Sequence, residues 1–148
     1  MIQKIMKHCL FVLFISGIFM HSGVNAAQEK VDTLVVTACL MEIPGKFAPN
    51  DLYNYVYIMK YKVIAVEKGI YKESEILVGQ YNPLISRANI KDKMDVHVNG
   101  TATSFTVGSK HRLVLVVPLS SVWNDAIEDE YFDSPMEKYF AVKTDIVK

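Results

Sequence analysis

Carboxylates form the densest group of chemistry-bearing side chains, in the segment 124–137. A hard cation such as Ca²⁺ takes about six to eight oxygen ligands, so the supply is adequate. The spacing, however, lacks the alternating ligands, central glycine and late glutamate of an EF-hand loop. We therefore expect a solvated acidic loop with no metal and no other cofactor, and calcium binding is the alternative. The candidate ligands are Asp125, Glu128, Asp129, Glu130 and Asp133, followed by Glu137.

Histidine and cysteine could supply a transition-metal site. Beyond residue 26 these types occur only as Cys39, His97 and His111. A zinc site takes three or four nitrogen, sulfur or carboxylate ligands, but neither His-x-His nor Cys-x-x-Cys occurs. We expect both histidines to be ordinary strand residues and Cys39, which has apolar neighbours, to be a buried inert thiol. A metal-dependent enzyme or metal-binding protein that uses His97, His111 and acidic-loop carboxylates is the alternative.

Enzyme motifs are missing from the chain. Catalysis needs a nucleophile with a base, paired carboxylates, or a metal with an open position. The sequence contains no Gly-x-Ser-x-Gly, no His-Glu-x-x-His and no phosphate-binding glycine loop. We therefore predict a protein without catalytic activity.

Aromatic side chains are the other candidate functional group. Residues 53–67 alternate, which places four tyrosines on one face of a strand. Tyrosine offers a large rigid area with a polar tip, which suits stacking on sugar rings or holding a partner protein. The alternative is that these rings cover the core of a barrel. The candidate binding residues are Tyr53, Tyr55, Tyr57 and Tyr61, and then Trp123 and Tyr131 near the acidic loop.

The N-terminal segment has the pattern of a secretory signal peptide. A basic start at Lys4 and Lys7 precedes an apolar run over residues 9–20, and small residues follow up to Ala26 and Ala27. The run is shorter than the roughly 20 residues that span a bilayer, so we expect cleavage after Ala26 or Ala27 and export to the periplasm or the medium. An uncleaved membrane anchor is the alternative.

Removing residues 1–26 changes the composition of the rest. Two lysines leave, so 14 basic residues remain against 16 acidic ones, and Cys39 remains as the single cysteine. No intramolecular disulfide can form, and the small net charge gives no long-range attraction for nucleic acid or an anionic membrane. We expect one domain over residues 27–148 that is held together by its core and has no stable membrane span after cleavage.

The periodicity beyond the signal is two, which predicts an all-β domain. We expect strands over residues 33–43, 53–67, 75–81, 111–117 and 138–147. Asn99-Gly100 predicts a type I′ turn, and therefore a hairpin that pairs 94–98 with 101–107. Segment 84–93 is either a loop or one short helical turn. Several short strands joined by turns suggest a closed or nearly closed barrel, which leaves no exposed edges.

Three stretches resemble the β-barrel core of bacterial netrin-like or tissue-inhibitor-of-metalloproteinase-like domains. They read VDTLVVTACLMEI, YKVIAVEKGIYKESEILVGQY and FTVGSKHRLVLVV, and together they span residues 31–117. The resemblance implies a small antiparallel barrel of the oligonucleotide/oligosaccharide-binding (OB) type. The inhibitors of that family chelate the protease zinc through an N-terminal cysteine, whereas this chain would begin at Ala27 and holds Cys39 in mid-strand. Protease inhibition is therefore expected only by some other mechanism.

Together these features predict an exported, non-catalytic binding or accessory domain. Its partner would be a protein or a saccharide of the bacterial envelope or the extracellular space. Nucleic acid is not expected as a partner, because the basic residues are dispersed along the chain.

Overall fold

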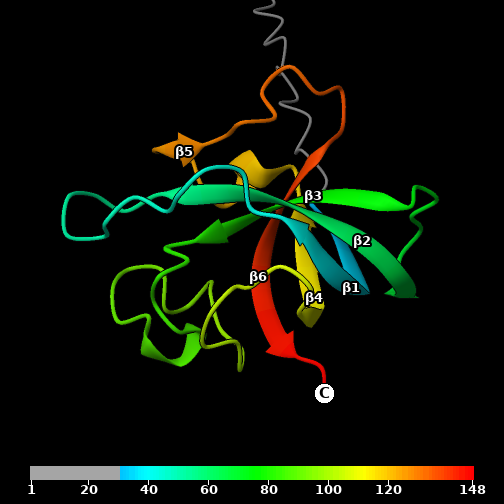
Figure 1. Ribbon diagram of the computed structural model, residues 1–148, viewed down its shortest axis with the longest axis horizontal. Helices are drawn as coiled ribbons and strands as arrows, with labels where there is room; N and C mark the ends of the chain where they lie inside the picture. The colour runs from blue at the N-terminus through cyan, green and yellow to red at the C-terminus, as the bar shows by residue number, and fades with distance from the viewer. Residues whose placement is uncertain (1–30) are drawn as a thin grey trace, which may run out of the picture.

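The protein is described by a computed structural model over residues 31–148 (Figure 1). The predicted signal peptide and its cleavage site lie outside these residues. Within residues 31–148, no helix has the length and apolarity that a membrane span requires.

A closed five-stranded barrel forms the body of the protein. Its strands follow the order β1-β4-β6-β3-β2, and pairing of β1 with β2 closes the ring. The predicted all-β, OB-like barrel is confirmed, but it is not purely antiparallel, because β3 pairs with β6 in parallel. The barrel strands are β1 (Asp32–Glu42), β2 (Val56–Lys68), β3 (Glu75–Tyr81), β4 (Lys110–Val117) and β6 (Lys138–Ile146). The remaining elements are β5 (Ile127–Glu128) and the 3-10 helices η1 (Arg87–Asn89) and η2 (Leu119–Ser121).

Strand β2 closes the barrel because it contacts both of its sequence neighbours. Residues Val56–Lys62 pair with β3, and residues Lys60–Lys68 pair with β1. The β1 pairing contains three register shifts, and such bulges bend a strand and increase its twist. The long strand can therefore curve from one side of the barrel to the other.

Both faces of the first half of β2 are buried. Tyr57, Met59 and Tyr61 of β2 belong to the barrel core, as does Tyr55 just before the strand, which confirms the predicted alternation. The opposite face packs in a second apolar cluster, which includes segments from outside the barrel. Its members include Val56, Ile58, Leu77, Ile90, Met94, Leu119 and Trp123. The outer face of β2 and β3 is thus covered by the protein's own side chains.

The Asn99-Gly100 hairpin predicted from the sequence is wrong. Residues 94–97 form a turn, and Asn99 makes a parallel bridge to Lys143 of β6. The physical reason is the short β3–β6 pairing, which covers only Leu77–Gly79 and leaves backbone groups of β6 without a partner strand. Segment 99–102 takes that place, with the amides of Thr101 and Ala102 both donating to the carbonyl of Thr144 at 3.1 Å.

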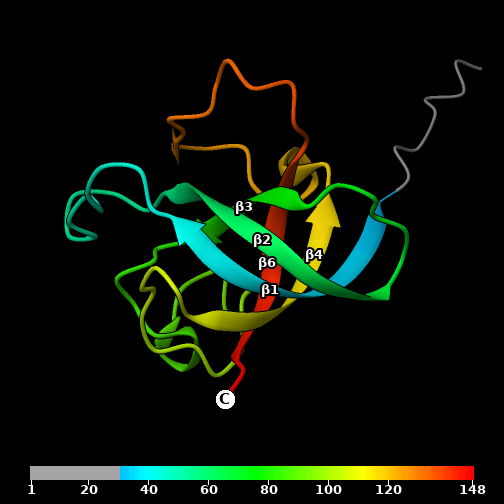
Figure 2. The same cartoon turned by 45° about the vertical axis from the view of Figure 1, so that its right-hand side comes forward.

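Gly100 is required by this close approach and not by a tight turn. A Cβ on Gly100 would lie 2.1 Å from the Thr144 carbonyl oxygen, and its φ is +127°. The predicted alternative of one short helical turn within 84–93 is present as η1. Figure 2 shows the whole connection between β3 and β4 packed against one end of the barrel, away from the excursion between β5 and β6.

We predict that Gly100→Ala destabilises the protein much more than Gly108→Ala. Both glycines have positive φ, so each alanine meets a backbone cost of about 1 to 2 kcal/mol. Only at Gly100 does the new Cβ also collide with backbone, because nothing lies within 4 Å of the corresponding position at Gly108. Urea unfolding of both variants measures the difference, and equal losses of stability would contradict the pairing of segment 99–102 with β6.

Candidate functional site

Two loops meet beside the first residues of β2. One is the β1–β2 loop, residues 43–55, and the other is the acidic loop, residues 124–137. Strand β5 lies in the acidic loop and pairs in parallel with Val56 and Tyr57. The Tyr53 hydroxyl donates a hydrogen bond to the Glu128 carboxylate at 2.5 Å. Figure 1 shows β5 beside the β1–β2 loop, so the two loops are positioned together by β2.

The predicted tyrosine stripe is largely buried, which corrects its expected role as a binding surface. Tyr55 and Tyr61 are fully buried and Tyr57 is 4 % exposed, whereas Tyr53 is 40 % exposed. The Tyr55 hydroxyl donates to the Ala48 carbonyl at 2.7 Å, and burial raises the pKa of Tyr55 to about 12. The alternative that these rings cover the barrel core therefore applies to Tyr55, Tyr57 and Tyr61. Of the four tyrosines, only Tyr53 is exposed to solvent.

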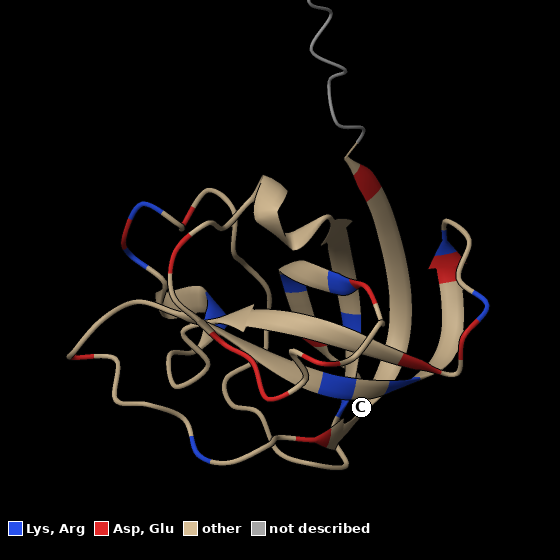
Figure 3. Cartoon of the chain, turned by 90° about the horizontal axis from the view of Figure 1, so that it is seen from above, with Lys and Arg blue, Asp and Glu red and all other residues tan. Residues whose placement is uncertain are grey.

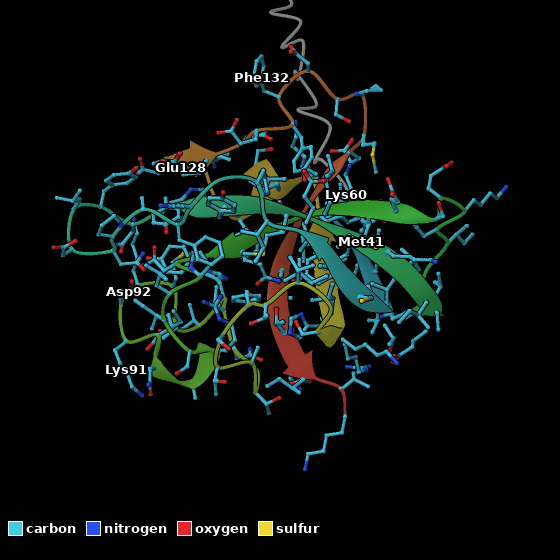
Figure 4. All side chains as sticks on the ribbon, in the orientation of Figure 1. Met41, Lys60, Lys91, Asp92, Glu128 and Phe132 are labelled. Atoms are coloured by element: carbon cyan, nitrogen blue, oxygen red, sulfur yellow. The ribbon has the colours of Figure 1, made fainter. Side chains whose placement is uncertain are left out.

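Other apolar side chains at the two loops are exposed, although no pattern in the sequence predicts this. Leu52 and Phe132 are each 72 % exposed, and Ile127 is 43 % exposed. Figure 4 labels Phe132 on the acidic loop and Glu128 on β5. We call these residues, together with Tyr53 and the exposed carboxylates Glu130 and Asp133, the loop surface.

Several carboxylates of the acidic loop bind groups within the loop or next to it and so stabilise its conformation. Asp129 forms an ion pair with Lys138 at 2.9 Å and accepts a hydrogen bond from the Tyr131 amide at 2.8 Å. Asp125 accepts from the Ala126 amide at 2.9 Å, and Glu128 accepts from Tyr53. Within residues 31–148 no three His, Cys, Asp or Glu side chains are arranged to hold a metal ion.

The two histidines lie in different surroundings, so the alternative metal site is not assembled. His97 is exposed in the 94–97 turn, which differs from the strand position expected for it. His111 is 1 % exposed and belongs to β4. Cys39 is half-buried, not buried as expected, and its thiol donates to the Gly108 carbonyl at 3.5 Å.

A chain of buried polar side chains crosses the barrel interior. The Thr144 hydroxyl donates to Gln80 Oε1 at 3.1 Å, and Gln80 Nε2 donates to the Tyr61 hydroxyl at 3.5 Å. Tyr61 lies 3.3 Å from His111 Nδ1. Because the Tyr61 oxygen already accepts from Gln80, its proton is free to go to His111. Burial lowers the pKa of His111 to about 4, so the imidazole is neutral at neutral pH.

Ser109 lies at the end of this series of hydrogen-bonded side chains and is not arranged as a nucleophile. Its Oγ lies 3.4 Å from His111 Nε2, but it donates its proton to the Thr106 carbonyl at 2.6 Å. His111 therefore donates to Ser109 instead of accepting from it. A catalytic Ser-His pair needs the opposite direction.

Arg87, the first residue of η1, belongs to the β3–β4 connection and is buried. Its residue is 2 % exposed, and Nη2 donates to the carbonyls of Asn82 at 2.8 Å and Ile85 at 2.7 Å. The guanidinium lies over the Phe105 ring, 5.2 Å from its centroid. Burial lowers the pKa of Arg87 to about 10, so it stays charged at neutral pH. Among the described residues, Nε and Nη1 have no hydrogen-bond partner.

The last two candidate binding residues are also largely covered. Trp123 is 3 % exposed, and its Nε1 donates to the Ala126 carbonyl at 2.9 Å. Tyr131 is half-buried, and the Lys60 ammonium lies 5.1 Å from its ring centroid. Burial and the nearby Glu42 carboxylate raise the pKa of Tyr131.

Basic residues are spread over several elements, as Figure 3 shows, and do not gather on one face. Comparisons with protein-family models, curated proteins and solved structures find no match to this chain. The resemblance to netrin-like domains stays a prediction, because a small closed barrel does not by itself identify that family.

We predict that His111 makes stability depend on pH. Its folded pKa of about 4 lies below the ordinary 6.5, so between these values the unfolded chain binds the proton and the folded chain does not. The contribution of His111 to the free energy of unfolding is complete above the unfolded pKa, and it falls as pH decreases toward 4. The loss between pH of about 7 and about 5 is on the order of 2 kcal/mol.

Urea unfolding of the protein and of His111→Gln at the two pH values measures this contribution. The variant should show a smaller loss on acidification, and His97→Gln should keep the original loss because His97 is exposed. An unchanged pH dependence in His111→Gln would show that His111 is not buried as a neutral ring.

We predict that Tyr57→Ala lowers stability by about 3 kcal/mol or more, because it removes a buried ring. The ring packs edge-on against Phe47 at a centroid distance of 4.9 Å. Tyr53→Ala, on the exposed ring of the same loop region, should cost less than about 1 kcal/mol. Thermal and urea unfolding of the two variants compares them, and similar losses would contradict the assignment of Tyr57 to the core.

Proposed function

We propose that this chain is an exported, non-catalytic binding domain that holds a protein partner through the loop surface. Export rests on the signal-peptide pattern of the N-terminal sequence. The observation that carries the binding role is the convergence of the β1–β2 loop and the acidic loop beside β2, with four apolar side chains left exposed on them. These are Leu52, Tyr53, Ile127 and Phe132.

The OB-like topology supports this choice of surface. OB-type barrels bind ligands on the face of strands 2 and 3 and on the loops between strands 1 and 2 and strands 4 and 5. Here the outer face of β2 and β3 is covered by Leu119 and Trp123. The corresponding loops are the β1–β2 loop and the segment between β4 and β6, and both carry exposed apolar side chains.

The charge of the loop surface supports a partner of defined chemistry. Glu130 and Asp133 are exposed beside Phe132, and Glu128 adjoins Ile127. Apolar anchors supply most of the affinity at a protein interface, while complementary charge increases the association rate and selects the partner. The loop surface therefore suits a protein segment that presents basic side chains next to apolar ones.

Site-specific crosslinking in the intact producing cells tests this function. We predict that a photo-crosslinking residue in place of Leu52 or of Phe132 captures the same protein. The control is the same residue in place of Val96, which is 75 % exposed but lies outside the loop surface. Capture from position 96 equal to that from positions 52 and 132, or no capture from either, would contradict the proposal.

The charge of the captured partner is tested in the same experiment. The double variant Glu130→Lys and Asp133→Lys should lower the yield of the crosslinked adduct from position 132. With Glu130 and Asp133 in place, the yield should fall as the salt concentration increases. An adduct that is insensitive to both changes would rule out a basic partner segment.

A further inference from the structure

A hollow beside the single tryptophan has the volume of a small-molecule site. Its volume is about 380 Å³, and it lies between the 94–97 turn and the segment that follows η2. Sites for small molecules begin at about 300 Å³ and combine apolar lining with a few placed polar groups. The residues that line it include Lys93, Met94, His97, Trp123, Asn124 and Asp125. Figure 4 labels Lys91 and Asp92, which lead into the 94–97 turn.

Hydrogen bonds fix both walls of the hollow. Asp92 accepts from the Met94 amide at 2.8 Å and from the Tyr81 hydroxyl at 2.7 Å, which anchors the turn to β3. On the other wall, Trp123 donates to Ala126, and its ring packs edge-on against Tyr81 at 5.1 Å. The walls are therefore held in place before a ligand arrives.

The polar groups around the hollow offer both donors and acceptors. Lys93 donates, Asn124 does both, and Asp125 retains a carboxylate oxygen beyond the one bound to the Ala126 amide. The opposite charges of Lys93 and Asp125 balance, so the hollow does not select an ion of either sign. We propose that this hollow binds a neutral saccharide, because a sugar combines an apolar C–H face with hydroxyls that both donate and accept.

Trp123 is 3 % exposed, and Lys93 lies over the ring face that the C–H face of the sugar would contact. Its ammonium lies 5.7 Å from the Trp123 ring centroid, where the electron-rich face attracts positive charge. Lys93 is exposed, and exposed side chains change rotamer within picoseconds to nanoseconds. The lysine can therefore turn away from the indole and donate to a hydroxyl of the ligand. This inference does not rest on the loop surface, since its residues are different.

The fluorescence of Trp123 reports on this hollow directly, because the chain contains one tryptophan. The probes are the methyl glycosides of glucose, galactose, mannose and N-acetylglucosamine, each titrated into the mature full-length domain. At least one should give a saturable change in emission. If every titration is flat or merely linear, the inference is wrong, and a saturable change with choline alone would assign the hollow to cations instead.

Variants locate the binding. Asn124→Ala and Asp125→Asn should each weaken the saturating glycoside by about fivefold, which corresponds to one lost hydrogen bond. Asn89→Ala changes an exposed asparagine on η1 and should leave the affinity unchanged. Equal affinity in all three variants would overturn the site. Failure of the sugar titrations leaves the crosslinking result at positions 52 and 132 unaffected, so the two proposals are tested separately.

Discussion

The structure depends on the short parallel pairing between β3 and β6. These strands pair over only three positions of β3, Leu77–Gly79, and then diverge. Buried backbone groups need partners, so the open side of β6 must be paired by another part of the chain. Segment 99–102 does this, and the connection that brings it there also places Arg87 over Phe105 and sets the 94–97 turn next to Trp123. The barrel end, the Asn99-Gly100 geometry and the hollow are thus results of one incomplete strand pair.

Sequence reasoning predicts the barrel strands because their apolar residues repeat in ways that only burial explains. The expected strands 75–81 and 111–117 lie within one residue of β3 and β4. It fails at Asn99-Gly100 because a glycine with positive φ can serve a close backbone approach as well as a turn. Met94 and Val98 are apolar because they pack against the second cluster, and their alternation imitates a strand.

The functional residues are harder to predict than the fold, for a physical reason. Alternation assigns Tyr55 and Tyr57 to one face but does not say whether that face meets solvent or core. Leu52 and Phe132 stand in loops without periodicity, so nothing in the sequence distinguishes them from apolar residues that pack inward. Exposure of an apolar side chain is a property of the whole fold. The loop surface and the Trp123 hollow therefore become visible only when distant segments are brought together.

The hydrogen bond from Ser109 to Thr106 has an effect that reaches across the barrel. The Thr106 carbonyl oxygen carries no proton, so it can only accept a hydrogen bond. Ser109 must donate there, His111 must carry its proton on Nε2, and Tyr61 must donate to Nδ1. The orientation of the Gln80 amide and of the Thr144 hydroxyl follows in turn. The Thr106 carbonyl oxygen, in a surface turn, thus selects one tautomer of His111 and one orientation of the Gln80 amide. These two side chains lie on β4 and β3, and the turn forms no strand pairing with either.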